Sequence, residues 1–458
     1  MTELSSGWIE TSLFDACELI TDGTHHSPIN GPEGDFKYIT AKNIKKGGLD
    51  LESVTYVNAS THAEIYRRCP PKKGDVLYIK DGATTGIAVI NPLDEQFSML
   101  SSVALLRPDP RLLMSEYLCH QLNSPDVFRR MTGDMTGSAI RRLTLSTISR
   151  QTIVIAPLLE QQRIVSKIDS LSAKSKRARD QLDHIPRLVE KYKQAILAAA
   201  FDQALRSAGT QTSLANIAVE VRNGLSKKPH DGPPGIPILR ISAVRSLAVN
   251  TEDQRYYPPT EAVPSTFLLR EGDLLFTRYN GNPEFTAVCG VVRGVSDELT
   301  YPDKLIRVRL NEKASPNFVE LMFASPQARA WLWPHIKTAA GQHGISGKDL
   351  KQCPVPLPPM AEQAKIVQHT QSHLAWVNRL ASEATSARRL IDHLDQAVLS
   401  KAFRGELVPQ DPSDEPASSL LERIRAERAA APVKVKARGP KQFVRQGRPK
   451  RSAKSIPS

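Results

Sequence analysis

Residues 159–165 read LEQQRIV, and a closely similar stretch, AEQAKIV, returns at residues 361–367. A second pair of stretches, QAILAAAF at 194–201 and QAVLSKAF at 396–403, repeats at the same offset of 202 residues (361 minus 159, and 396 minus 194). Because both pairs share one offset, nothing is inserted or lost between them in either copy. The chain is therefore predicted to be an internal duplication whose two copies fold alike.

Each copy of this pattern is predicted to be a long helix. In the first copy apolar residues recur at steps of three and four from Ile164 onward, through Tyr192 and Ile196, which is the spacing of a coiled-coil seam. The corresponding positions in the second copy are less apolar. Each helix would be about 65 Å long, and neither can bury its stripe alone, so we expect them to pair with each other. Pro186 should kink or break the first helix near Ile185.

The segments before the two helices are predicted to be globular and of mixed α/β class. The stretch GDVLY at 74–78 matches GDLLF at 272–276 at an offset of 198 residues (272 minus 74). Short apolar runs separated by Gly, Pro and Asn indicate strands, and helical patterns follow near residues 115–130 and 317–333. The predicted fold is thus two α+β domains separated by two long helices, with a pseudo-twofold internal repeat.

Proline-containing junctions at residues 155–158 and 355–359 cannot lie inside helices, and they set the helix starts just downstream. We therefore expect a first globular domain at 1–156 (the first head), a first spacer helix at 157–206, a second globular domain at 207–357 (the second head), a second spacer helix at 358–410, a C-terminal partner-docking segment at 411–432 and a basic disordered tail at 433–458.

The overall composition is that of a globular protein with a basic end. The 458 residues carry a formal net charge of +13, and nine Lys or Arg but no acidic residue lie from Val433 onward. This tail could bind phosphates or could be only a solvated end, so charge alone does not establish nucleic-acid binding. Five scattered cysteines argue against a disulfide framework or a zinc knuckle. With no apolar run of about 18 residues and no secretory signal, a cytoplasmic protein without a membrane span is expected.

The motifs that accompany catalysis are missing. The strings NPLD at 91–94 and NPEF at 282–285 lack the second proline of an adenine-methylating motif. No glycine-rich loop opens a helix after a strand as a nucleotide site requires, and no HExxH zinc motif occurs. We expect no catalytic residue, no metal site and no cofactor in this chain.

The contrast between closely repeated helices and loosely repeated domains suggests a constant spacer that holds two variable heads. Two unlike heads would read two unlike DNA half-sites about one helical turn, ~34 Å, or more apart. The alternative is a duplicated coiled-coil scaffold that binds only proteins and has no DNA specificity. The architecture alone does not separate these two hypotheses.

Several longer stretches bear on that choice. Gly7-Trp8 near the start, ISGKDL at 345–350, PPMAEQ at 358–363, LSKAFRGELVP at 399–409 and DEPASSLLERIR at 414–425 together resemble the specificity subunits of type I restriction–modification systems. The resemblance covers nearly the whole chain, apart from the basic tail.

The resemblance implies a mechanism. Each head would be a target recognition domain that reads one half of an asymmetric, bipartite double-stranded DNA site. The helices would form an antiparallel coiled coil and dock two methylation subunits, which hold S-adenosylmethionine and methylate adenine. Restriction subunits, which use ATP and Mg²⁺, would complete the complex around one copy of this chain.

Base-reading residues should be polar or basic side chains on loops. In the first head we expect DNA contacts from Thr24, His25, Lys42, Asn43, Lys80, Thr84 and Arg141. In the second head we expect them from Arg222, Asn223, Lys227, Arg240, Arg278, Tyr279, Asn280, Lys304 and Lys348. For each residue the alternative is a solvated charge or a local turn bond, and the stretch at 24–26 could instead bind a metal.

Contacts with partner subunits are expected at the helix starts and near the C-terminus. Glu160, Gln161, Glu362 and Gln363 begin the helices, where the resemblance implies contact with a methylation subunit, whereas the alternative is a favourable interaction with the helix dipole. The same role is expected for Phe403 and for an apolar patch of Leu420, Leu421 and Ile424.

Overall fold

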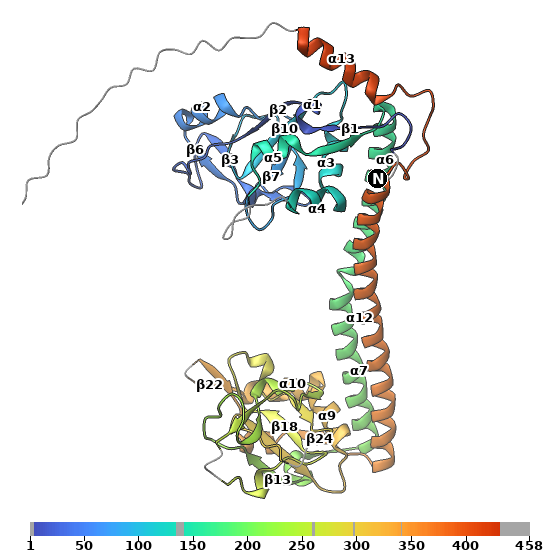
Figure 1. Ribbon diagram of the computed structural model, residues 1–458. Helices are drawn as coiled ribbons and strands as arrows, with labels where there is room; N and C mark the ends of the chain where they lie inside the picture. Colours follow the sequence, from blue (N-terminus) through green and yellow to red (C-terminus); the bar gives the residue numbers. More distant parts are fainter. Residues whose placement is uncertain (1–3, 134–141, 259–261, 296–297, 340, 431–458) are drawn as a thin grey trace, which may run out of the picture. The chain divides into compact units, whose positions relative to one another are not determined.

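The computed structural model describes residues 4–133, 142–258, 262–295, 298–339 and 341–430 (Figure 1). The chain divides into two compact units. Unit 1 combines Met1–Lys174 with His393–Ser458, and unit 2 comprises Ser175–Asp392. The C-terminal part of the chain therefore folds with the N-terminal part.

Unit 1 is built around a four-stranded antiparallel sheet. Its strand order is β2-β10-β7-β8, with bounds Cys17–Asp22, Val103–Pro108, Val76–Ile79 and Ala88–Ile90. Along β7 the side chains alternate between two apolar clusters, because Val76 and Tyr78 lie in one and Leu77 and Ile79 in the other. Both faces of the sheet are thus covered, which explains why the strand reads as a continuous apolar run.

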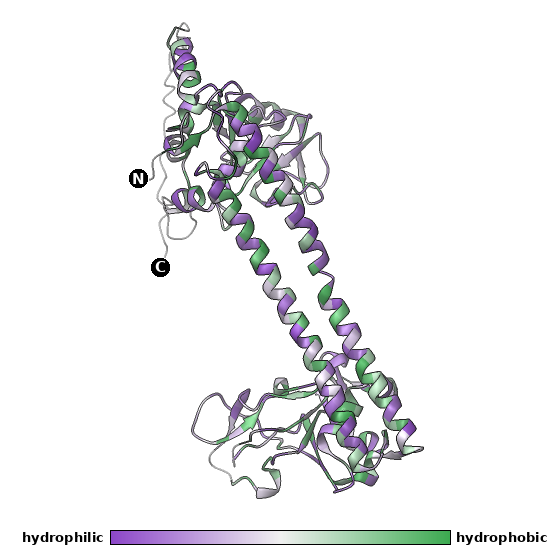
Figure 2. Cartoon of the chain, turned by 90° about the vertical axis from the view of Figure 1, so that its right-hand side faces the viewer, coloured by the Kyte–Doolittle hydropathy of each residue, from purple (hydrophilic) through white to green (hydrophobic). Residues whose placement is uncertain are grey.

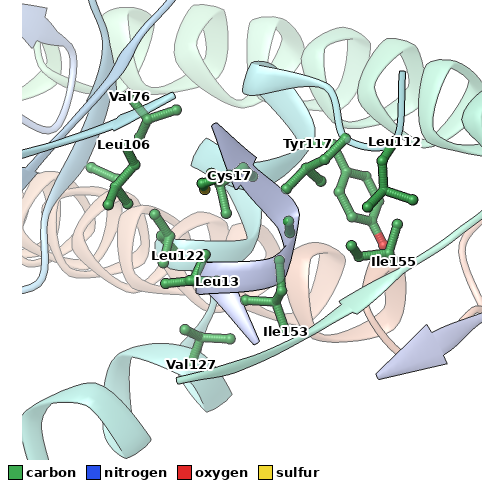
Figure 3. Close-up of a cluster of buried hydrophobic side chains, with 14 of the residues drawn as sticks. Leu13, Cys17, Val76, Leu106, Leu112, Tyr117, Leu122, Val127, Ile153 and Ile155 are labelled. Carbon is green, nitrogen blue, oxygen red and sulfur yellow. The ribbon is translucent and has the colours of Figure 1, made fainter. Parts of the chain in front are cut away.

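Two helices, α3 (Ser115–Leu122) and α4 (Pro125–Gly133), cover one face of this sheet. Tyr117, Leu122 and Val127 from these helices pack with Leu106 of β10 in the larger cluster (Figure 3). The other elements of unit 1 are β1 (Ile9–Ser12), α1 (Leu13–Ala16), β3 (Phe36–Ile39), β4 (Ile44–Lys45), β5 (Gly48–Leu49), β6 (Thr55–Val57), α2 (Ala59–Arg68), β9 (Ser98–Met99), α5 (Leu145–Arg150), β11 (Thr152–Ile155), α13 (Ala417–Ala430) and the 3-10 helix Ala41–Asn43.

Unit 2 repeats this architecture. Its four-stranded sheet has the order β13-β21-β18-β20, with bounds Ala218–Asn223, Leu305–Leu310, Leu274–Thr277 and Cys289–Val291, covered by α9 (Pro316–Ala324) and α10 (Pro326–Leu332). The remaining elements are β12 (Gln211–Ser213), α8 (Leu214–Ile217), β14 (Ile236–Leu239), β15 (Val244–Arg245), β16 (Ala248–Val249), β17 (Gln254–Tyr257), β19 (Tyr279–Asn280), β22 (Lys337–Ala339), β23 (Gln342–Gly344), α11 (Gly347–Lys351), β24 (Pro354–Pro356) and the 3-10 helices Ile241–Ala243, Ser265–Phe267, Pro283–Phe285 and Trp333–His335.

The duplication extends to single side chains. Arg107 donates two hydrogen bonds to Asp75 across the sheet of unit 1, and Arg309 donates to Asp273 at the same place in unit 2. The predicted fold class, two mixed α/β domains with two long helices and an internal repeat, is confirmed.

The long helices are α6 (Leu158–Leu182), α7 (Ile185–Ala208) and α12 (Met360–Ala402), and apolar residues recur along them between polar ones (Figure 2). Within unit 2, helices α6 and α7 run antiparallel to α12. Arg179 of α6 lies 3.1 Å (Nε to Oδ1) from Asp392, toward the end of α12, whereas the later residue Gln203 of α7 donates a hydrogen bond to Glu362 at the start of α12. Within unit 1 the start of α6 packs with the end of α12 in the larger cluster.

Pro186 ends the first helix as expected. Helix α6 stops at Leu182, and Pro186 lies in the first turn of α7. Proline has no N–H to donate to the carbonyl of Leu182, and its ring would collide with that carbonyl in a continuous helix. Beyond the break the predicted apolar seam is wrong by one residue. The sequence predicts a seam through Tyr192 and Ile196, but Tyr192 is 61% exposed, and Leu197 is buried where Ile196 is expected to be.

The five cysteines are free, and four of them are buried while Cys119 is partly so. Burial raises the pKa of Cys17, Cys69, Cys119 and Cys353 to about 12, and that of Cys289 well above its usual value. Since the thiolate is the reactive form, we expect no fast reaction with a thiol reagent at pH 8 in the native chain and five reactive thiols after unfolding. Fast modification of any native thiol would contradict this packing.

Candidate nucleic-acid interface

One edge of the second head's sheet brings several of the predicted base readers together. Strand β13 ends at Asn223, β18 ends at Thr277 and β21 begins at Leu305, and the pairing register places these three ends side by side. The loop residues that follow are joined there, because the Arg278 N–H donates to Lys304 O at 2.8 Å. Asn223, Arg278, Tyr279, Asn280 and Lys304 are therefore gathered at this edge, and none of them is fully buried.

The Arg278 side chain is held in a defined position. Its guanidinium carbon lies 4.7 Å from the centre of the Tyr279 ring, and Nη1 donates to Asp303 O. Its Nε is buried without a hydrogen-bond partner. The outer nitrogens of an arginine fixed in this way are suited to bidentate recognition of guanine.

The first head has the same edge with different side chains. Strand β2 ends at Asp22, and Thr24 N–H donates to Met99 O at 2.9 Å, while Lys80 N–H donates to Ser102 O at 2.9 Å. The duplication thus places Lys80 where the second head has Arg278. Thr24, His25 and Lys80 lie together at this edge.

An ion-pair cluster fills this part of the first head. Buried Asp22 lies within 3.4 Å of Lys80 Nζ and 2.7 Å of Arg68 Nη2, and Asp81 lies 3.2 Å from Arg142 Nε. Arg68 and Arg142 keep 51% and 60% of their side chains exposed. These two arginines were not among the expected DNA contacts. Arg142 directly follows Arg141, which is the only sequence signal that could have identified it.

Two expected base readers are committed to internal bonds. Lys80 is 4% exposed and lies between Asp22 and Asp81. Asn43 is 3% exposed, and its Oδ1 accepts from the Thr40 N–H in the capping box of a 3-10 helix. Their burial argues against direct base contact, because a base edge cannot reach them without rearrangement. They hold neighbouring loops in place instead.

The remaining expected DNA contacts are more scattered. Thr84, Lys42, Lys227, Arg240 and Lys348 are exposed, and Arg240 pairs with Asp231 and Asp253. Arg222 is half-buried, 2.6 Å from Glu220, with its guanidinium over the Phe267 ring. Arg141 lies outside the described residues.

The metal hypothesis for residues 24–26 is not supported. His25 Nε2 lies 2.9 Å from Arg68 Nη2 and 3.4 Å from Asp22, so a cation is already present beside it. Among the residues that the structure describes, no group of three or more His, Cys, Asp or Glu side chains is placed to hold a metal ion.

The glutamine at each helix start fastens a head to its helix. Buried Gln161 donates from Nε2 to Leu112 O and Ala156 O at 2.8 Å each, and its Oε1 accepts from Met114 N–H at 2.9 Å. Gln363 makes the same three bonds in unit 2, donating to Lys313 O and Pro358 O and accepting from Ser315 N–H. This repeated clamp explains why the sequence AEQ or LEQ occurs in both copies.

The neighbouring glutamates differ. Glu160 is 1% exposed and accepts a 3.0 Å hydrogen bond from Trp8 Nε1, whereas Glu362 is partly exposed and accepts from Gln203. The burial of Glu160, Gln161 and Gln363 argues against direct contact with a partner subunit. Their role is within the chain, and only Glu362 keeps an accessible side chain.

Burial raises the pKa of Glu160, and the Trp8 bond and the charge of Arg163 offset this only in part. Because the folded chain then binds a proton more readily than the unfolded chain, the stability of unit 1 should fall as pH rises from 4.5 through the raised pKa. We expect Glu160→Gln to remove this fall, since its amide oxygen still accepts from Trp8. Thermal unfolding of the wild-type chain and of Glu160→Gln between pH 4.5 and 8 measures the effect, with the surface substitution Glu116→Gln as the control. A melting temperature that falls with pH as steeply in Glu160→Gln as in the wild type would contradict this expectation.

The apolar C-terminal patch is internal. Leu420, Leu421 and Ile424 of α13 are buried in the same cluster as Trp8, and Phe403 packs edge-on to Tyr117 at 5.2 Å between ring centres. Arg163 pairs with Asp414 at 2.5 Å, and Arg425 with Asp15 at 2.5 Å. The expected docking of a partner on this patch is therefore corrected: α13 covers the core of unit 1.

Among the described helices, none is long and apolar enough to cross a membrane.

A family model for the type I restriction modification DNA specificity domain matches residues 5–186. The specificity subunit of the type I restriction enzyme EcoKI of Escherichia coli K12 is 33% identical over 451 residues, which cover 94% of this chain and 97% of that protein. The corresponding StySPI subunit of Salmonella potsdam is 26% identical over the same shares of the two chains.

Solved structures share the fold. The HsdS subunit from Thermoanaerobacter tengcongensis has a TM-score of 0.57 at 20% identity, covering 89% of this chain and 100% of that one. A chain from a study of complex assembly and conformational transition in the type I R-M system has a TM-score of 0.66 at 19% identity, covering 88% of this chain and 100% of that one. With a full-length relative at 33% identity and a specificity-domain model that matches its first part, the chain belongs to the family of type I restriction enzyme specificity subunits.

Proposed function

We propose that this chain reads an asymmetric DNA target in two parts, one part by each head. As a specificity subunit it supplies DNA sequence recognition and is the non-catalytic subunit of its system. The observation that carries the proposal is the repeated sheet edge, which has one backbone arrangement and two sets of side chains. Asp22, Lys80 and Asp81 in the first head correspond to Asn223, Arg278 and Tyr279 in the second.

A common frame with different side chains is what two unlike half-sites require. Contacts to phosphate position a protein on DNA, whereas contacts to base edges specify the sequence. Exposed cations such as Lys304, Arg68 and Arg142 at the two edges suit the first task. The different polar groups that stay accessible beside them, Thr24 and His25 in the first head and Asn223 and Asn280 in the second, suit the second task.

We also assign the target recognition domains to residues 1–156 and 207–357, the spacer helices to 157–206 and 358–410, a C-terminal segment to 411–432 and a basic tail to 433–458. The last of these lies outside the described residues. We expect the chain to act in the cytoplasm, where its DNA target lies.

The partners that we propose are double-stranded DNA, two adenine-methylating subunits that use S-adenosylmethionine, and restriction subunits that use ATP and Mg²⁺, with one copy of this chain per complex. Large apolar side chains remain exposed on the helices in unit 2, among them Tyr192, Trp376 and Leu390, and Leu159 is exposed at the start of α6 in unit 1. Exposed apolar surface of this kind is typical of a protein-binding site. We place the methylation subunits there rather than on the buried α13.

Co-expression of the chain with the methylation subunit of its own system, followed by mapping of methylated adenines in plasmid DNA, tests the proposal. We expect one asymmetric motif in two parts. Replacing Arg278 and Asn280 together with alanine should alter only one part, because both lie in the second head. Lys351→Ala, an exposed residue at the end of α11, is the matched control.

Methylation at no defined motif by an intact complex would contradict sequence reading and would favour the scaffold hypothesis. Alteration of both parts by the paired substitution would contradict the assignment of one part to each head.

A further inference from the structure

The second head carries a small polar ribbon that has no role in its core. Strands β22 and β23 form a hairpin whose register pairs Thr338 with His343, and β23 pairs in turn with β19. Lys337, Thr338, Ala339 and Gln342 are exposed, and no residue from 337 to 343 among those described belongs to an apolar cluster of unit 2. Figure 1 shows β22 at the outer edge of this head.

The register aligns three polar side chains on one face of this ribbon. Asn280 of β19 pairs with His343 of β23, which pairs with Thr338 of β22. Because directly paired residues of antiparallel strands share a face, these side chains form a row across the three strands. The Thr338 hydroxyl and His343 Nδ1 share a hydrogen bond of 2.9 Å.

The opposite face of the ribbon anchors it to the head. Tyr279 pairs with Gly344, and a Cβ on Gly344 would lie only 2.5 Å from two carbons of the Tyr279 ring. The ring is therefore placed between the Gly344 backbone and the Arg278 guanidinium. The His343 carbonyl also accepts from the buried Thr286 hydroxyl at 3.2 Å. The row of polar groups is thus fixed relative to the sheet edge.

We propose that Thr338 and His343 determine DNA sequence specificity in the second head, reading base edges in the major groove together with Asn280. The major groove admits a two-stranded ribbon, here the β22–β23 hairpin, and Asn280 of the neighbouring strand β19 extends the row at its edge. Strands lie about 4.8 Å apart, so the row spans about 10 Å, close to the rise of three base-pair steps. This inference rests on the proposed function, since it names the residues by which the second head reads its part of the target.

The experiment compares Thr338→Val, His343→Ala and the pair of them with Gln342→Ala. Gln342 is the matched control because it is an exposed polar residue of the same hairpin that pairs with Ala339 and so lies on the other face. Each chain is assembled with the methylation subunit, its methylated motif is mapped, and its affinity for target and single-base variants of the target is measured.

We expect Thr338→Val and His343→Ala to relax one or two base pairs in one part of the motif, with about tenfold loss of discrimination there. Gln342→Ala should leave the motif unchanged. Since all these side chains lie outside the core, the variants should still assemble with the methylation subunit. The part of the motif that the first head reads should stay the same.

Two results would overturn the inference while the proposed function stands. In the first, a wild-type complex reads its motif and both variants read the same motif with undiminished discrimination. In the second, the variants lose the methylation subunit instead of base discrimination, which would make the ribbon a protein contact. A wild-type complex without any motif would overturn the proposed function itself.

Discussion

Replacing Arg307 alone with leucine should destabilise unit 2 by about 1–3 kcal/mol, because the carbonyls of Thr266 and Leu268 lose a donor and Glu220 keeps only Arg222 and Arg309 as charge partners. Arg307 is completely buried in β21, with Nη2 2.6 Å from Glu220 Oε2 and Nη1 donating to Thr266 O and Leu268 O. Hydrogen exchange of peptides from β13 and β21 in increasing urea measures the loss. Arg270→Leu, at an exposed position of the same head, should change stability by less than about 0.5 kcal/mol.

The duplication supplies a sharper test of the same pair. By strand register Arg307 and Glu220 correspond to Leu105 and Leu19 of the first head, which pack in an apolar cluster there. Buried ion pairs can be replaced by apolar residues of similar volume with little loss. The double substitution Glu220→Leu with Arg307→Leu should therefore recover most of the stability that Arg307→Leu loses. A double variant as unstable as the sum of its single substitutions would contradict this equivalence.

Replacing Gln363 with alanine should destabilise unit 2 by about 2–4 kcal/mol, because Ser315 N–H and the carbonyls of Lys313 and Pro358 lose their common partner in a buried place. Gln363→Glu should be at least as harmful, since a carboxylate oxygen would face the two carbonyl oxygens. Urea unfolding of the chain, followed with hydrogen exchange at α9 and α12, is the measurement.

Gln371→Ala, at an exposed position on the same helix, is the control and should be nearly neutral. The duplication predicts that Gln161→Ala has the same effect on unit 1. A loss below about 0.5 kcal/mol for either clamp substitution would mean that the three bonds are replaced by water or by relaxation.

The order of domains and helices could be predicted because it rests on local signals. Repeated stretches, proline junctions and apolar spacing identify helices without knowledge of any distant contact. The predicted apolar seam is wrong beyond Pro186, because the prediction continued the same spacing of three and four residues through a break in the helix. Beyond the break Leu197 is buried in the apolar cluster of unit 2, whereas Ile196 is only partly buried.

The candidate site was predicted less well because exposure depends on long-range packing. The sequence does not show that Lys80 pairs with both Asp22 and Asp81, or that Leu421, near the other end of the chain, is buried in the same cluster as Trp8. Asn43 is a good base reader by chemistry and a good cap by position, and only the fold selects the cap. The position of Arg278 and Asn280 at the strand edge could be predicted because they follow a strand directly and precede a glycine turn.

We propose that each of the two repeated heads reads its own part of one DNA target. This is tested most directly by a chain in which the first head is replaced by a second copy of the second head, joined at the matching strand pairs β1–β11 and β12–β24. The methylation motif of the assembled complex is then mapped beside that of the wild type. We expect a motif with two identical half-sites, both of them the part that Arg278 and Asn280 control. An active complex that still methylates the wild-type asymmetric motif would contradict it.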